Sequence, residues 1–329
     1  MIFKEDFMSS VMNIAIAVNR AYVKYAYVML TSLCQHQNEQ LNIYILHHDL
    51  AAEDQDLLSP LIKEYSITLH FIYVPDHLLP PSEVLQANSW GVETYFRLLL
   101  VDLLPDTIDR ALYIDVDMII NKPLNDFYFC ELGSNKLAAC LDFTGTPPFE
   151  DYRQELFAEF ISPDFIYINA GLTLFNLSEL RPFYNFAYYM DTAQRLDYKI
   201  QFPDQDLLNY CHWNEVLLFD ENKYNLYARR AYTDRGATLQ SVKQTSHVVH
   251  FATAKPWQGN CFHCELEQLW WDYAKQTPFY IEFLKQMVYE TINSNETFTY
   301  AMNLQLENKQ LYQIISQYDT LLKNNGIII

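Results

Sequence analysis

The chain has little glycine and few cysteines for its length. Only 7 of its 329 residues are glycine, which excludes collagen-like and linker-rich sequences. Its 6 cysteines are scattered, without the density of a small disulfide-stabilised scaffold. We therefore expect reduced, mostly buried thiols, as in a cytoplasmic protein. Cys261 and Cys264 have the spacing of one ligand pair of a zinc site. No second pair follows, so structural zinc is disfavoured.

Basic residues and long apolar segments are also scarce. The 22 Lys and Arg residues are outnumbered by 41 Asp and Glu residues, which gives a net charge of −19. This balance argues against a groove for nucleic acid and limits membrane contact to weak, peripheral binding. The apolar run 11–18 is too short to span a bilayer, and the acidic start lacks the basic region of a signal peptide. We expect a soluble, cytoplasmic protein.

Hydrophobic residues make up 50% of the chain, and their rhythm indicates an α/β fold. Short apolar runs at 13–18, 41–47 and 67–74 alternate with helical patterns at 21–36 and 51–65. Strands that alternate with helices predict a mainly parallel sheet with helices on both faces. Further strands are expected at 111–114, 137–141, 167–175 and 248–250.

Several polar groups follow the predicted strands, where an open α/β sheet builds its site. Asp115 and Asp117 end the strand 111–114, and side chains two apart in an extended segment share a face. Mg²⁺ and Mn²⁺ prefer carboxylate oxygens. His250 also ends a strand and could be a third ligand, and Lys255 could meet phosphate as a point charge. The alternative, an exposed charged turn, would leave two like charges together without a partner.

Seven motifs, in one order between about residue 13 and residue 257, resemble glycosyltransferase family 8. This family includes bacterial lipopolysaccharide α-galactosyltransferases and glycogenin. The motifs are residues 17–22, 94–98, 112–117, 139–142, 167–171, 203–209 and 250–257. One such motif is weak evidence, whereas seven in order are strong.

The resemblance implies a GT-A fold, a UDP-hexose donor, Mn²⁺ or Mg²⁺, and retention of anomeric configuration. It implies that Asp115, Asp117 and His250 hold the metal. The resemblance places Ala17, Asn19 and Tyr22 at uracil and ribose, Lys255 at the diphosphate, and Val116 among the donor-binding residues. The residues that it places around the donor sugar are Arg97, Asp142, Asn169, Ala170, Asp204 and Gln205. Gln205, Asp204 and Asp142 are the candidate catalytic residues.

Two positions depart from the family pattern. Asn19 stands where the family usually has Asp, but an amide can still accept from uracil N3–H and can donate to O4. Thr253 lies in a shortened loop where the family usually has Gly before the lysine. Because Gly permits close backbone approach to phosphate, this change alters the backbone beside the expected diphosphate contact.

The segment 265–329 has a different, helical character. Residues Leu304, Leu311, Ile314, Tyr318 and Leu321 fall at heptad-like positions, with Glu307 interrupting the series. We expect a GT-A catalytic domain at 1–264 and a helical extension at 265–329. The extension either joins two chains in a homodimer or packs on its own domain, and the pattern does not decide between them.

The expected activity is transfer of galactose or glucose from a UDP-sugar to a saccharide or other hydroxyl acceptor, as in polysaccharide biosynthesis. Gln205 is a neutral amide and a poor nucleophile, so we favour front-face attack over a covalent intermediate. Two alternatives stay open: a UDP-sugar-binding protein without catalysis, and an interaction protein organised by the helical tail. We expect the acceptor to bind loops at about 76–93, 143–165 and 225–245.

Overall fold

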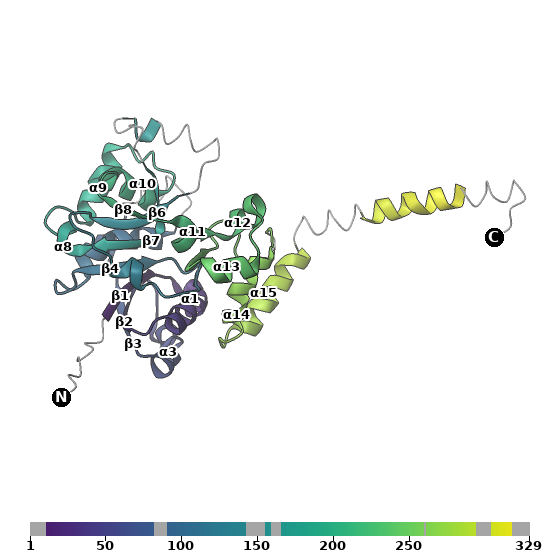
Figure 1. Ribbon diagram of the computed structural model, residues 1–329, viewed down its shortest axis with the longest axis horizontal. Coiled ribbons are helices and arrows are strands. Elements are labelled where there is room, and N and C mark those ends of the chain that lie inside the picture. The colour runs from purple at the N-terminus through teal and green to yellow at the C-terminus, as the bar shows by residue number, and fades with distance from the viewer. Residues whose placement is uncertain are drawn as a thin grey trace, which may run out of the picture. The chain divides into compact units, whose positions relative to one another are not determined.

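The computed structural model describes residues 11–81, 91–142, 155–158, 166–259, 261–293 and 304–317 (Figure 1). The chain divides into two compact units. The first comprises Met1–Thr253 and Cys264–Thr277, and the second comprises Ala254–His263 and Pro278–Ile329. The expected division into residues 1–264 and 265–329 stays a prediction.

A seven-stranded mixed sheet forms the centre of the first unit. Its order is β3-β2-β1-β4-β7-β6-β8 (Figure 1). The strands are β1 Val11–Ala17, β2 Gln40–His47, β3 Ile67–Tyr73, β4 Arg110–Ile114, β6 Leu137–Leu141, β7 Ile168–Asn176 and β8 Val216–Phe219. Neighbouring strands pair in parallel except at β7, which runs antiparallel to both β4 and β6. The predicted mixed, mainly parallel α/β fold is confirmed.

A second, three-stranded sheet was not predicted. It consists of β5 Met118–Ile120, β10 Val248–His250 and β9 Leu226–Tyr227. The central strand β10 pairs antiparallel with β5 and parallel with β9. Because β5 begins directly after Asp117, the chain passes from the first sheet to the second through residues 115–117.

The helices of the first unit are mostly short. They are α1 Val23–His36, α2 Ala52–Asp56, α3 Ser59–Glu64, α5 Leu100–Leu103, α6 Asn125–Tyr128, α8 Leu177–Leu180, α9 Phe186–Arg195, α10 Pro203–His212, α11 Glu221–Tyr224, α12 Ala228–Arg235, α13 Leu239–Thr245 and α14 Gln268–Ala274, with 3₁₀ turns η1 Arg20–Tyr22, η2 Asp76–Leu78, η3 Val92–Leu99 and η4 Glu265–Glu267. The prediction of a single helix at 51–65 is wrong, because the segment forms two helices, α2 and α3. The break occurs because Pro60 fits only the first turn of a helix, here that of α3. The loop expected at 225–245 is instead β9, α12 and α13.

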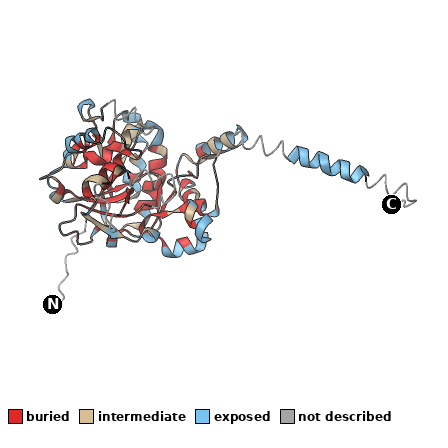
Figure 2. Ribbon diagram, turned by 90° about the horizontal axis from the view of Figure 1, so that it is seen from above, coloured by how far each residue is buried: buried red, intermediate tan, exposed pale blue. Residues whose placement is uncertain are grey.

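Both faces of the main sheet are covered. Ala15 and Tyr113 pack on one face with Leu207 of α10 and with residues of η3, α5, α8 and α9. Ile14 and Leu112, one position earlier in each strand, point to the opposite face and are also fully buried. Figure 2 shows the buried residues gathered in the interior of the first unit. These layers hold the strand ends, and the side chains that follow them, in place.

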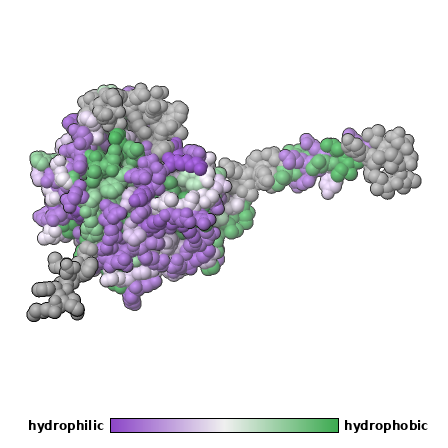
Figure 3. Space-filling view, viewed as in Figure 1, coloured by the Kyte–Doolittle hydropathy of each residue, from purple (hydrophilic) through white to green (hydrophobic). Residues whose placement is uncertain are grey.

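The second unit contains α15 Tyr280–Asn293 and a helix at residues 304–317. Gly259 N donates to Glu290 Oε2 at 2.8 Å, which ties the segment 254–263 to α15. The helix 304–317 is exposed along its length and carries apolar side chains, including Leu304, Leu311 and Ile314 (Figures 2 and 3). Tyr318 and Leu321 of the predicted stripe lie outside the described residues. In the parts of the chain that the structure describes, no helix has the length and apolar character needed to cross a membrane.

Candidate active site

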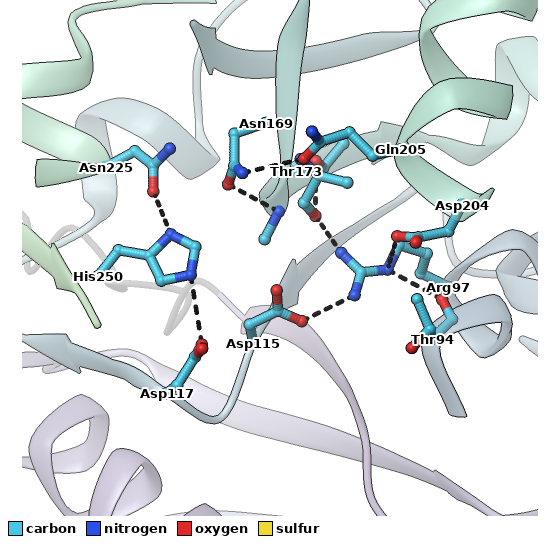
Figure 4. Close-up of polar contacts among 12 residues, drawn as sticks. Thr94, Arg97, Asp115, Asp117, Asn169, Thr173, Asp204, Gln205, Asn225 and His250 are labelled. Atoms are coloured by element: carbon cyan, nitrogen blue, oxygen red, sulfur yellow. Dashed lines mark hydrogen bonds and ion pairs between the residues drawn. The ribbon is translucent and has the colours of Figure 1, made fainter. Parts of the chain in front are cut away.

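Three side chains from separate parts of the chain meet where the two sheets join. Asp115 follows β4, Asp117 precedes β5, and His250 ends β10. One ligand atom from each lies within 4.8 Å of the others (Figure 4). The pairing of β10 with β5 brings His250 there, and Phe251 N donates to Asp117 O at 3.0 Å. The fold therefore assembles the three residues that the sequence suggested as a metal site.

The orientation of His250 is set by a hydrogen bond on its far side. Nδ1 lies 2.8 Å from Asn225 Oδ1, and an amide oxygen can only accept, so Nδ1 carries the proton. On the other side of the ring, Nε2 lies 3.3 Å from Asp117 Oδ1 (Figure 4). With the Nδ1 proton donated to Asn225, Nε2 can offer its lone pair, and an imidazole nitrogen and a carboxylate oxygen at this distance suit a shared divalent cation.

Gly171 makes room beside this cluster. A Cβ atom at this position would lie 2.8 Å from Asp115 Oδ2 and 2.9 Å from His250 Cε1, closer than ordinary contact. The backbone can approach the two ligands only because the residue has no side chain. Two carboxylates and one imidazole whose ligand atoms lie within 4.8 Å of one another fit a divalent ion such as Mn²⁺.

Arg97 forms an ion pair with Asp115, one of the two carboxylates of this cluster. Its guanidinium lies 2.8 Å from Asp115 Oδ1 and 2.8 Å from Asp204 Oδ2, and it donates to Ala170 O at 2.6 Å. It also lies over the ring of Tyr113, 4.2 Å from the centroid. Burial opposes the charge, but Asp115 and Asp204 raise the pKa of Arg97, so it stays cationic. Burial raises the pKa of Asp204 to about 6, an effect that Arg97 opposes.

Gln205 stands at the start of α10 in a fixed orientation. Its Oε1 accepts from Ala170 N at 2.9 Å and from Asn169 Nδ2 at 3.0 Å. Its Nε2 donates to Asp142 Oδ2 at 2.9 Å. Rotation of the amide would break all three hydrogen bonds, which fixes its orientation. These bonds bring Gln205 together with Asp142, Asn169 and Ala170, as the sequence suggested.

The direction of β7 explains why these groups meet. Because β7 runs antiparallel to β4 and β6, its first residues lie beside the last residues of those strands. Asn169, the second residue of β7, therefore lies near Asp142, which follows β6. Gly171 O accepts from Asp115 N at 2.8 Å. The Gln205 network and the cluster of Asp115, Asp117 and His250 are thus parts of one site.

Several contributors were not predicted as functional residues. Asn225 holds His250, and the Tyr227 hydroxyl donates to Asp142 Oδ1 at 2.7 Å and accepts from Asn169 Nδ2 at 2.9 Å. Burial, followed by the charge of Asp142, raises the pKa of Tyr227 well above its usual value, so the hydroxyl keeps its proton. These contacts join residues 25 to 85 positions apart, and no local spacing in the sequence signals them.

The other predicted donor-binding residues have more local roles in the structure. Ala17 ends β1, and Asn19 Oδ1 accepts from Tyr22 N at 3.2 Å and so caps η1. Tyr22 is exposed, Val116 is buried, and Lys255 belongs to the second unit. Their contacts with a donor stay predictions.

The expected acceptor loops are only partly visible. Of the segments 76–93 and 143–165, residues 82–90, 143–154 and 159–165 lie outside the described residues.

Comparison with known proteins places this site in a family context. The sequence profile described as glycosyl transferase family 8 matches residues 13–261. A lipopolysaccharide 1,2-glucosyltransferase of Escherichia coli is 26% identical over 221 residues, 65% of this chain and 62% of that protein. A lipopolysaccharide 1,3-galactosyltransferase of Salmonella typhimurium is 24% identical over 255 residues, 75% of this chain and 73% of that protein.

Among solved structures, the galactosyltransferase LgtC in complex with donor and acceptor sugar analogs superposes with a TM-score of 0.68. The superposition covers 81% of this chain and 96% of that chain, at 22% identity. At this identity the likeness shows the fold alone, which is the expected GT-A fold.

Proposed function

Because the chain belongs to glycosyltransferase family 8, we propose that it moves galactose or glucose from a UDP-sugar to a saccharide hydroxyl with retention of configuration. The observation that carries the proposal is the cluster of Asp115, Asp117 and His250, whose ligand atoms lie within 4.8 Å of one another. Arg97 and Gly171 connect this cluster to the Gln205 network, so a metal-bound diphosphate and the sugar attached to it would occupy neighbouring positions.

The proposed metal is Mn²⁺, held by Asp115, Asp117 and His250. When bound, it would supply the positive charge that neutralises a diphosphate leaving group. The protein needs such a charge here, because its net charge is −19 and Arg97 is already paired with two carboxylates. We propose Lys255 as a second cation for the diphosphate.

Gln205 is proposed to lie beside the anomeric carbon of the donor. Its Oε1 already accepts from two N–H groups, and a neutral amide is a poor nucleophile. This supports attack by the acceptor hydroxyl on the face that UDP leaves, without a covalent sugar–enzyme intermediate. Asp142 and Asn169, held in place by their hydrogen bonds, would bind the sugar hydroxyls.

One further candidate function rests on a different observation. Leu304, Leu311 and Ile314 are exposed on the helix 304–317, which favours a contact between two chains or with another protein. We propose a homodimer through this helix in addition to catalysis. Its apolar stripe would then be covered by the partner.

The test is a donor assay with the purified full chain. UDP-glucose, UDP-galactose and GDP-mannose are each incubated with Mn²⁺, with and without EDTA, and UDP or GDP release is measured by mass spectrometry. We expect Mn²⁺-dependent release from a UDP-hexose only. Binding of a UDP-hexose without release would indicate a non-catalytic binding protein, and no binding at all would contradict the proposed donor.

A further inference from the structure

We infer that Asn225 and Tyr227, at the short strand β9, are positioning residues for both halves of the active site. Asn225 fixes the metal ligand His250, and Tyr227 fixes the sugar-side residues Asp142 and Asn169. The inference rests on the proposed function, because it assigns roles toward its metal and donor sugar.

Asn225 sets which nitrogen of His250 is available. Asn225 is 1% exposed, and its Oδ1 lies 2.8 Å from Nδ1 of the ring. This bond keeps the proton on Nδ1 and leaves the Nε2 lone pair directed at the cluster. Without it, the ring could rotate or carry its proton on Nε2, and either change would remove a metal ligand. The backbone at Asn225 is held, because its N donates to Glu221 O at 3.0 Å.

Tyr227 closes a ring of hydrogen bonds on the sugar side. Its hydroxyl donates to Asp142 Oδ1 at 2.7 Å, and Gln205 Nε2 donates to Asp142 Oδ2 at 2.9 Å. Asn169 Nδ2 donates both to Gln205 Oε1 at 3.0 Å and to the Tyr227 hydroxyl at 2.9 Å. Each oxygen of Asp142 therefore accepts one of these hydrogen bonds, and removal of the Tyr227 hydroxyl breaks two bonds of the ring.

The pairing of β9 with β10 fixes the positions of Asn225 and Tyr227 relative to His250. Tyr227 pairs with His250, and Leu226 pairs with Val249. The rings of Tyr227 and His250 lie 5.1 Å apart. Because only Leu226 separates Asn225 from Tyr227, the metal ligand and the sugar-side ring are set by one short backbone segment. A shift of β9 would move both together.

The role of Asn225 is tested by Mn²⁺ binding, which needs no turnover. Paramagnetic resonance measures free Mn²⁺ in titrations of wild type, Asn225→Ala, Asn225→Ser and Asn225→Asp with saturating UDP. We expect affinity to fall about 10- to 100-fold in the Ala and Ser variants, as for other partners of metal-bound histidines. The Asp variant keeps an acceptor for Nδ1–H and should bind Mn²⁺ within about threefold of wild type.

The matched control is Asn222→Ala, which removes the amide of an exposed residue on α11. It should leave Mn²⁺ affinity unchanged. Thermal melting of each variant identifies any that does not fold, and the Ser variant replaces the Ala variant if the latter fails. Wild-type affinity in folded Ala and Ser variants would overturn the role of Asn225.

The role of Tyr227 is tested by separating metal binding from turnover. Tyr227→Phe removes the hydroxyl alone, so we expect unchanged Mn²⁺ affinity and a fall of about tenfold in kcat for UDP-hexose, with a smaller change in KM. Tyr224→Phe, three positions earlier and packed against Phe127 and Phe219, is the control. A Tyr227→Phe variant that melts earlier but keeps its kcat would show a merely structural role.

Failure of this inference differs from failure of the proposed function. Wild-type protein that neither binds Mn²⁺ with UDP nor releases UDP contradicts the proposed function. Wild-type protein that does both, beside Asn225 and Tyr227 variants that behave like it, overturns only the positioning roles.

Discussion

Replacing Gly171 with alanine should damage the proposed metal site more than the fold. The added Cβ would lie 2.8 Å from Asp115 Oδ2, 2.9 Å from His250 Cε1 and 2.7 Å from Met118 Cε. The end of the Met118 side chain can move away. Asp115 is held by Arg97, and the His250 ring is held by Asn225, so neither ligand can move without losing a hydrogen bond.

The size of the effect follows from these distances. Ordinary contact begins at 3.4 Å, so the two ligand side chains must move by about 0.5 to 0.6 Å. Metal sites tolerate deviations of about 0.2 Å in ligand distance. We expect Gly171→Ala to weaken Mn²⁺ binding and lower the transfer rate by about 100-fold. Overpacking should cost about 1–3 kcal/mol of stability.

The assay is Mn²⁺ titration in the presence of UDP, followed by UDP release from UDP-hexose and by thermal melting. Gly133→Ala is the control, because Gly133 has a φ of +57° and no neighbour within 4 Å of an added Cβ. It should cost about 1 kcal/mol of stability and leave Mn²⁺ affinity unchanged. A folded Gly171→Ala variant with wild-type Mn²⁺ affinity would refute the reasoning.

Four further predictions concern other parts of the molecule. Asp117→Ala, or EDTA dialysis of the wild type, should lower UDP release by about a thousandfold or more, and unchanged turnover would contradict a metal role. Calorimetry should show that UDP-hexose binds at least about tenfold more tightly than a GDP-hexose, with Asn19→Asp tolerated, whereas equal affinities would contradict uridine recognition. Burial lowers the pKa of His212 in the folded chain. As the pH falls, His212 is therefore protonated near pH 6.5 in the unfolded chain and only at a lower pH in the folded chain. Urea unfolding should therefore show stability falling below that pH, by at most about 1.4 kcal/mol per pH unit, and less steeply in His212→Gln; equal slopes would contradict this. Removal of residues 295–329 should give a soluble, active monomer, and light scattering that finds the full chain monomeric at micromolar concentration would exclude the homodimer.

Much of the first sheet follows from local sequence. Apolar runs such as 13–18 and 41–47 predict strands, because burial on both faces requires continuous apolar residues. The position of Asp115 at the end of such a run is also local information. Pro60 could have predicted the break between α2 and α3, since proline fits only the first turn of a helix. The order of the seven motifs was enough to predict the family, which the matching family profile confirms.

The assembly of the site was decided by the tertiary structure. Periodicity reports which residues are buried but not which strand pairs with which, so neither the antiparallel direction of β7 nor the sheet of β5, β10 and β9 could be read from the sequence. That direction brings Asn169 to Asp142, and that sheet brings His250 to Asp117. Asn225 and Tyr227 gain their roles in the same way. Hydrogen bonds act over about 3 Å of space whatever the separation along the chain, and only the folded backbone sets those distances.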